Sequence, residues 1–214
     1  LDAGPVLAIA LPAIATNAAT PIANAIVTAA FAPYGDSAVA GWAVIGRIQP
    51  VAFGFVFAMS GSVGPIIGQN LGAGKPERAE KSVWIAGFAN AIFLGLVTVV
   101  FLIFAEPMIR FFTDDPVVVP IGVACLKIVS YGYVFYAFGM VMTQSFNGAG
   151  DTLTPTWINL PCYWAFQLPL AYALSLWAKW EVNGAFWAIT IAESTLAVVA
   201  VWAFRRGKWK EVKV

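Results

Sequence analysis

Long apolar segments separated by short polar breaks make up almost all of this 214-residue sequence. Six such segments cover roughly residues 6–31, 38–66, 82–105, 118–146, 154–178 and 184–204. An apolar run longer than about 18 residues with few charges is typical of a helix that crosses a bilayer. A soluble fold of this length could not bury so much apolar surface, because 60% of the residues are hydrophobic and only 11% are charged. The sequence therefore predicts a membrane protein.

We expect an all-α membrane protein in which the six spans form a transmembrane bundle. Only helices and closed barrels satisfy their backbone hydrogen bonds inside a bilayer, and no stretch alternates between apolar and polar residues over the length of a barrel strand. Several spans exceed the ~20 residues that cross a membrane upright, so tilted or kinked helices are expected. Residues 1–204 would form the bundle, and residues 205–214 a basic tail.

Lysine and arginine in the short loops indicate which end of the bundle faces the cytoplasm. The loop after the second span carries Lys75, Arg78 and Lys81. The tail carries five more cations: Arg205, Arg206, Lys208, Lys210 and Lys213. Because the opposite loops carry only Arg110 and Lys179, both termini are expected in the cytoplasm, and the bundle in a bacterial or archaeal inner membrane. We interpret the tryptophans near the span ends as interfacial anchors, namely Trp177, Trp180, Trp187, Trp202 and Trp209.

Several classes of function are excluded by what the sequence contains. Histidine is absent, which removes Ser-His-Asp hydrolysis and histidine metal sites. Cys125 and Cys162 lie inside apolar runs and do not suggest a disulfide framework or a zinc site. A phosphate-binding loop would need glycine at Gln69 and serine or threonine at Pro76. We therefore expect no enzymatic activity, no metal site, no organic cofactor and no nucleic-acid partner, with the basic tail touching anionic lipid.

Three ionisable side chains fall inside the expected spans: Arg47, Lys127 and Glu193. Each costs on the order of 2.5–3.5 kcal/mol to insert, so each requires an explanation. All three spans run in the same direction, and each charge lies about nine residues, or ~14 Å, past its outer end. One hypothesis is that Glu193 pairs with Lys127 or Arg47, and that a proton or cation shifts this pairing during transport. The alternative is a static ion pair, with the spare cation snorkelling.

Polar residues also follow one face of the first expected span. Asn17, Thr20, Asn24 and Thr28 recur at helical intervals. Such a face either joins helices through hydrogen bonds or lines a cavity, and the pattern leaves both interpretations open. Further amides could serve as ligands for a partly dehydrated cation: Gln49, Asn90, Gln144, Asn159 and Gln167. Prolines in the first, second and fifth spans predict bent helices, and they are Pro12, Pro21, Pro50, Pro65, Pro155, Pro161 and Pro169.

Short motifs along nearly the whole chain occur in the order seen in one transporter lobe. The loop from Gly68 to Ala79 is the longest of them. The others are Leu11-Pro12-Ala13, Ala40-Gly41 with Arg47-Ile48, Phe112-Thr113-Asp114-Asp115-Pro116, Ser145-Phe146-Asn147-Gly148-Ala149-Gly150-Asp151-Thr152 and Gly207-Lys208-Trp209. With these motifs the sequence resembles the C-terminal six-helix lobe of the multidrug and toxic compound extrusion (MATE) family.

The resemblance implies a twelve-helix antiporter that exports organic cations, amphipathic drugs or metabolites in exchange for sodium ions or protons. This chain would supply the second lobe, and its partner would be the missing N-terminal lobe or a second copy. Some family members carry acidic cation ligands in the first and fourth helices of this lobe. Neither is carried over, because the first span offers Asn17 and Asn24 instead and the fourth offers Lys127.

Two other functions remain open at this point. A flippase for lipid-linked precursors, of the same superfamily, would need a more cationic cavity than Arg47 and Lys127 supply. The other is a truncated membrane subunit without transport activity, which would move no organic cation in proteoliposomes with or without a second lobe. We also expect no cleavable signal peptide, since no basic segment precedes a short apolar one, and we expect the start at Leu1 to be a cut.

Overall fold

The computed structural model describes residues 28, 31 and 34–210, and within these residues it contains helices and no β-strand. The long helices are α2 (Asp36–Gly72), α3 (Pro76–Arg110), α4 (Val118–Ser130), α5 (Tyr133–Gly148) and α8 (Glu181–Arg205). Between α5 and α8 the chain forms α6 (Leu153–Leu160), η2 (Pro161–Gln167), α7 (Leu168–Tyr172) and η3 (Ala173–Trp177) without interruption. Most of the first expected span, including Asn17, Thr20 and Asn24, lies outside the described residues.

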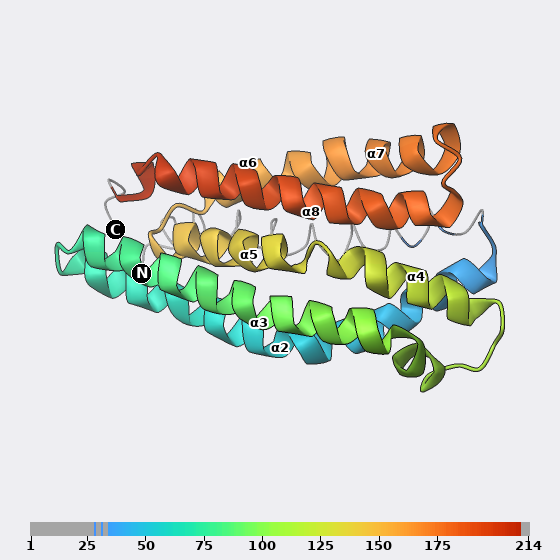
Figure 1. The fold of residues 1–214 in the computed structure, drawn as a ribbon. Coiled ribbons are helices and arrows are strands. Elements are labelled where there is room, and N and C mark those ends of the chain that lie inside the picture. The colour runs from blue at the N-terminus through green and yellow to red at the C-terminus, as the bar shows by residue number, and fades with distance from the viewer. Residues whose placement is uncertain (1–27, 29–30, 32–33, 211–214) are drawn as a thin grey trace, which may run out of the picture.

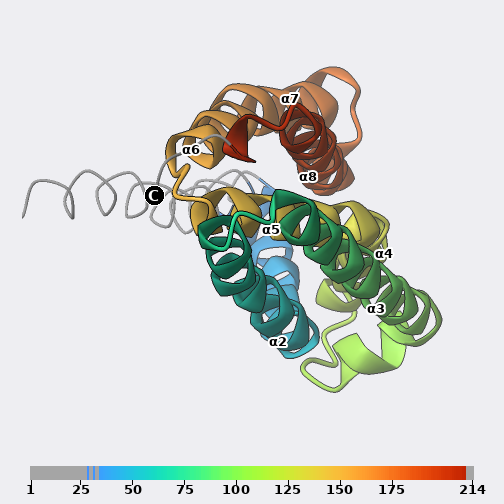
Figure 2. The same cartoon turned by 90° about the vertical axis from the view of Figure 1, so that its left-hand side faces the viewer.

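The helices pack as a bundle in which α5 is central. It contacts α2 and α3 on one side and α8 on the other, and the segment from α6 to η3 packs against α8 (Figures 1 and 2). Successive segments run in alternating directions. The turns at residues 73–75 and 149–152 therefore lie at the same end of the bundle as the C-terminal end of α8, and the turns at 111–117 and 178–180 lie at the other (Figure 1).

The outer face of α3 is apolar along its length. Its exposed side chains recur at helical spacing, and they are Ile85, Phe88, Ile92, Leu96, Val99 and Ile103. At ~1.5 Å per residue this stripe extends ~27 Å, close to the ~30 Å hydrocarbon thickness of a bilayer. Among the described residues, α2, α3 and α8 are each long and apolar enough to cross a membrane, and α4 with α5 would make a fourth span as a bent pair.

The expected fourth span is two helices rather than one. α4 and α5 meet at a 55° bend, where Tyr131 and Gly132 separate them. Two threonines from neighbouring helices stabilise the break, because Thr98 Oγ1 donates to the Ser130 carbonyl and Thr190 Oγ1 donates to the Ile128 carbonyl, both at 3.0 Å. Carbonyls released from a helix inside a membrane need such partners.

The fifth span is irregular, and its prolines explain why. Pro161 opens the π-helical segment η2, and Pro169 lies in the short α7 that follows. Proline has no N–H to donate to the residue four positions earlier, and its ring pushes that carbonyl aside. Wider π turns accommodate this disruption and are frequent at functional sites. The segment thus stays helical, but the direction in which successive side chains point shifts wherever α-helical and π-helical turns alternate.

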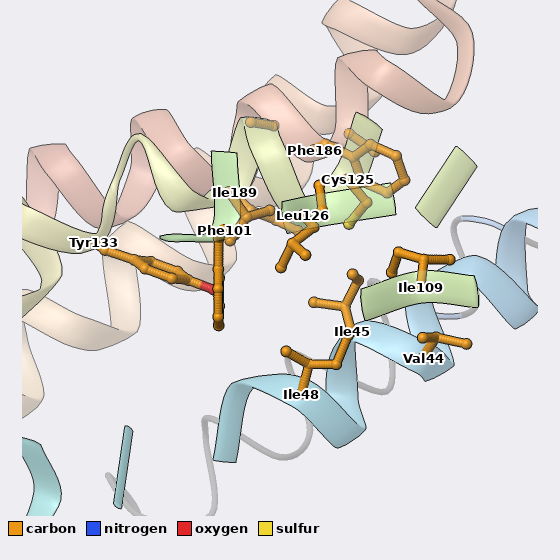
Figure 3. Packing of buried hydrophobic residues seen from close by; sticks show 14 of the residues in the cluster. Val44, Ile45, Ile48, Phe101, Ile109, Cys125, Leu126, Tyr133, Phe186 and Ile189 are labelled. Atoms are coloured by element: carbon orange, nitrogen blue, oxygen red, sulfur yellow. The ribbon is translucent and has the colours of Figure 1, made fainter. Parts of the chain in front are cut away.

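The main core lies where α2, α3, α4 and α8 converge. Ile45 of α2 and Leu126 of α4 point toward each other across it, and Phe186 of α8 packs beside Cys125 (Figure 3). Tyr133 and Phe101 extend the core toward the break between α4 and α5, with ring centroids 6.0 Å apart. Cys125 is fully buried and, like the partly buried Cys162, is a free thiol.

Part of the expected basic tail folds back onto the bundle. Trp209, in the 3-10 turn η4 (Lys208–Lys210), is fully buried and stacks on Phe204 with ring centroids 4.8 Å apart. Its interpretation as an interfacial anchor is therefore wrong. The turn is possible because Gly207 adopts a φ of 75°, which glycine tolerates without strain. Lys210 then pairs with Glu80 of α3 at 2.5 Å.

Candidate functional site

A cavity of about 440 Å³ lies between α2, α5, η2 and α8. Aromatic, amide and carboxylate side chains make up much of its described lining, and they are Trp42, Gln49, Phe53, Phe57, Tyr133, Tyr136, Tyr163, Gln167 and Glu193. Pro50 and Phe57 also line it and are exposed, so the cavity opens onto the surface of the lobe. Its volume is in the range of small-molecule sites. A second, shallow groove on the outer face of α3 is lined by apolar residues of the stripe, among them Ile85, Phe88 and Ile92, with Glu77, Glu80 and Lys81 at its end.

Glu193 is the acidic residue of this cavity. It lies twelve residues from either end of α8, so it stands ~18 Å from both ends of that helix. Tyr163 of η2 donates a hydrogen bond from its hydroxyl to Glu193 Oε1 at 3.2 Å. A carboxylate is thus held near the middle of a membrane-spanning helix, facing a cavity instead of lipid.

The two basic residues expected beside Glu193 lie elsewhere. Arg47 and Lys127 are exposed on the outside of α2 and α4, and neither lines the cavity. The ion pairs found among the described residues are Arg110 with Glu106 and Lys210 with Glu80. The structure therefore does not bring Glu193 together with either cation. The three charges lie at similar heights along their helices, but the helices turn Arg47 and Lys127 away from the cavity.

Aromatic rings packed against one another form a wall of the cavity that holds the carboxylate. Phe53 of α2 stacks on Tyr136 of α5 with centroids 5.0 Å apart and also meets Tyr133 edge to face at 4.9 Å. Gln49 donates from Nε2 to the Tyr133 hydroxyl at 3.1 Å, which ties α2 to α5. The negative faces of such rings attract cations. Wall and carboxylate together favour a positively charged ligand with an apolar body.

The amides predicted as cation ligands separate into two groups. Gln49 and Gln167 line the cavity. Asn90 instead donates to Ser60 Oγ at 2.9 Å, in the buried contact between α3 and α2, and Gln144 accepts a hydrogen bond from Asn147 on α5. Asn159 does not line the cavity either. Thr28 of the expected polar stripe is partly buried, while its other members lie outside the described residues.

Three tyrosines of the site were missed by sequence reasoning, and Tyr163, which bonds to Glu193, is the most important of them. The hydroxyl of a tyrosine in an apolar span needs a hydrogen-bond partner, just as a carboxylate does. Tyr133, Tyr136 and Tyr163 all lie inside expected spans, and each lines the cavity. Tyrosines in lipid-embedded helices were therefore an available signal for the position of the site.

Comparison with known proteins identifies the family. The MatE family matches residues 12–173. This chain belongs to the MatE family. It is 28% identical over 181 residues to the probable multidrug resistance protein NorM of Thermotoga maritima, a match covering 83% of this chain and 38% of that protein. It is 29% identical over 198 residues to the FAD transporter of Shewanella oneidensis, covering 92% of this chain and 43% of that protein. The MatE chain thus spans less than half the length of these curated relatives.

Solved structures of MATE transporters share the fold. The Vibrio cholerae MATE transporter VcmN in the bent form superposes with a TM-score of 0.86 at 26% identity, covering 94% of this chain and 45% of VcmN. An outward-facing multidrug resistance MATE family transporter superposes with a TM-score of 0.88 at 20% identity, covering 97% of this chain and 47% of that one. The predicted fold class, one helical lobe of a MATE-type membrane transporter, is confirmed.

Proposed function

We propose that this chain is one lobe of a secondary active efflux transporter that exports organic cations, amphipathic drugs or metabolites in exchange for sodium ions or protons. Membership of the MatE family supports transport, and several relatives are named as multidrug resistance proteins. The single observation that carries the cationic substrate is the Glu193 cavity, which combines one carboxylate with an aromatic wall.

The charge balance of the cavity explains why exchange would be obligatory. No lysine or arginine lines it among the described residues, and residues 1–46 contain neither. An uncompensated carboxylate in a low-dielectric setting is costly. A sodium ion, a proton or an organic cation can each neutralise Glu193. The lobe would therefore change conformation readily with one of these bound and reluctantly with none, which couples outward movement of substrate to inward movement of the ion.

The same charge balance distinguishes this proposal from a flippase. Lipid-linked precursors carry phosphates, and phosphate groups bind arginine and lysine. Arg47 and Lys127 are the two cations within the spans that could have served, and both lie outside the cavity. The observed lining favours cations over anions.

A second lobe and a defined orientation complete the proposal. The cavity opens onto the lobe surface, and the chain covers 38–43% of the relatives above, so we propose that an N-terminal lobe or a second copy covers the opening. The start of α3 and the end of α8 lie at the same end of the bundle (Figure 1), and the chain at these two points carries Lys75, Arg78, Arg205 and Arg206. By the positive-inside rule that end faces the cytoplasm of a bacterial or archaeal cell, with the apolar face of α3 in the inner membrane.

Transport by the complete protein in proteoliposomes tests this proposal. With the full reading frame reconstituted, a fluorescent organic cation should move against its gradient when a sodium or proton gradient is imposed in the opposite sense. Glu193→Gln should abolish the coupled movement while inserting normally. Glu181→Gln, at the exposed start of the same helix, should leave it unchanged. Absence of ion-driven movement in the unaltered protein, or full coupled movement in Glu193→Gln, would contradict the proposal.

A further inference from the structure

A buried oxygen in the cavity has no donor. Gln167 ends the π-helical segment η2 and is 4% exposed, and its Oε1 accepts no hydrogen bond from the described residues. Buried amide oxygens are almost always paired, because leaving one unpaired forfeits the hydrogen bond it would make in water. Three buried side-chain oxygens of the described residues lack a partner, those of Asn90, Gln167 and Ser175, and of these residues Gln167 is the one that lines the same cavity as Glu193. An unpaired acceptor in this position points to a ligand that donates a hydrogen.

Gln167 lies in the same part of the structure as Tyr163 and Glu193, because all three residues line one cavity. Tyr163, which donates to Glu193 at 3.2 Å, precedes Gln167 by four residues, and residues so spaced lie on the same side of a helix. The hydrogen of the Tyr163 hydroxyl is already given to Glu193, and the amide of Gln49 donates to Tyr133. Neither of these donors serves the Gln167 oxygen, so a bound molecule that carries an N–H can both neutralise Glu193 and supply the hydrogen bond that Gln167 lacks.

Classes of organic cation differ in whether they can donate a hydrogen bond to the Gln167 oxygen. A quaternary ammonium ion can approach Glu193 and the rings of Tyr136 and Phe53, but it has no N–H and leaves the Gln167 oxygen unpaired. A protonated amine or an amidinium-type cation neutralises Glu193 equally well and also donates hydrogen bonds. Sites that bury a hydrogen-bonding group discriminate strongly against ligands that lack the matching group.

We propose that the Glu193 cavity selects organic cations that carry N–H groups, namely protonated amines and amidinium-type ions, over quaternary ammonium ions of the same size. This selectivity rests on the proposed export of organic cations and assigns the discrimination to the amide oxygen of Gln167. Glu193 supplies charge recognition for both classes, whereas Gln167 distinguishes between them.

Two fluorescent probes that differ by one methyl group test the assignment. One ends in a dimethylammonium group, which carries a single N–H, and the other in a trimethylammonium group. Binding of both to the purified complete protein is followed by fluorescence, and their movement is followed in proteoliposomes. A hydrogen bond to a charged donor corresponds to a preference of roughly tenfold or more for the N–H probe.

Variants at Gln167 give the decisive comparison. Gln167→Met keeps the length of the side chain but lacks its oxygen, and it should bring the two probes to nearly equal affinity. Gln167→Glu retains an acceptor and should retain the preference, and Gln69→Met, at an exposed position outside the cavity, should leave it intact.

The possible results separate the two proposals. Equal affinity of the unaltered protein for both probes would overturn the role of Gln167, and so would a preference that survives in Gln167→Met. In either case, ion-driven movement of one of the probes would still support cation export. If neither probe bound or moved, the export proposal itself would fail, and the selectivity with it.

Discussion

The contact between α2 and α5 gives a stability prediction whose size can be worked out from the backbone. A Cβ added to Gly148 would stand 2.5 Å from the Cα and the carbonyl oxygen of Gly64. Carbon atoms in contact normally lie ~3.5–4.0 Å apart, and backbone cannot rotate away as a side chain can. Gly148→Ala therefore forces α2 and α5 apart by ~1 Å and loosens the packing of Val63 and Met142 beside them.

Overpacking of this kind costs about 1–3 kcal/mol. For a chain of this size that corresponds to a melting temperature lower by roughly 2–12 °C. Purified protein in detergent would be heated with a thiol-reactive dye, since the fully buried Cys125 becomes reactive as the core opens. Gly64→Ala is a matched control, because its Cβ would meet Gly148 at an ordinary 3.7 Å. Gly61→Ala is a second, with no atom within 4 Å.

Both controls should melt within about 2 °C of the unaltered protein or above it, because alanine is favoured over glycine in a helix by ~1 kcal/mol. The reasoning would be refuted if Gly148→Ala melted at or above the temperature of the unaltered protein. It would also be refuted if Gly64→Ala lost as much stability as Gly148→Ala.

Three further predictions concern the break, the tail and the orientation. Thr190→Val removes one of the two hydrogen bonds that the Ile128 carbonyl accepts at the bend, the other coming from the Tyr131 N–H, and should cost about 0.5–1.5 kcal/mol in stability, with faster amide exchange at residues 129–133 by mass spectrometry. Trp209→Ala removes a fully buried indole and should make the C-terminal segment markedly more sensitive to protease. In intact cells, cysteine at Gly74 should resist a membrane-impermeant thiol reagent, and cysteine at Ala178 should react with it, because positive-inside orientation places them on opposite sides.

Each of these predictions has an outcome that would contradict it, and the threonine prediction also has a matched control. Thr195→Val removes a hydroxyl that bonds only within α8, so an equal loss of stability in both threonine variants would argue against the bend as the cause. Unchanged proteolysis of Trp209→Ala would mean that the turn is held by the pair between Lys210 and Glu80 instead. Labelling of Gly74→Cys but not of Ala178→Cys would invert the proposed orientation.

The sequence predicted helices well and the rotation of helices poorly. Apolar runs specify where helices lie, and the expected spans from the second onward fall on α2, α3, α4 with α5, α6 to η3, and α8. The same composition hides which face points inward, because lipid-facing and core-facing surfaces are both apolar in a membrane. The sequence therefore predicts how far along their helices Arg47 and Lys127 lie but not which way their side chains point, and the expected pairing with Glu193 rests on that position alone.

Features that arise from tertiary contacts also lay beyond the sequence. At the bend between α4 and α5, carbonyls accept hydrogen bonds from the hydroxyls of Thr98 and Thr190, which belong to distant parts of the chain. Only the packed bundle shows that the oxygen of Gln167 lacks a donor. Glu193 can be identified from the sequence, because an acidic residue in the middle of an apolar run is costly to insert into a membrane and is therefore a candidate functional residue.

Competition between ions at Glu193 tests the central claim most directly. Binding of a fluorescent organic cation to the purified complete protein would be measured over a range of sodium concentrations and pH values. If one carboxylate serves both cations, the apparent Kd should rise about tenfold for each tenfold increase in the coupling ion above that ion's own Kd, and Glu193→Gln should lose this dependence. An apparent Kd that is independent of both sodium and pH in the unaltered protein would contradict the account.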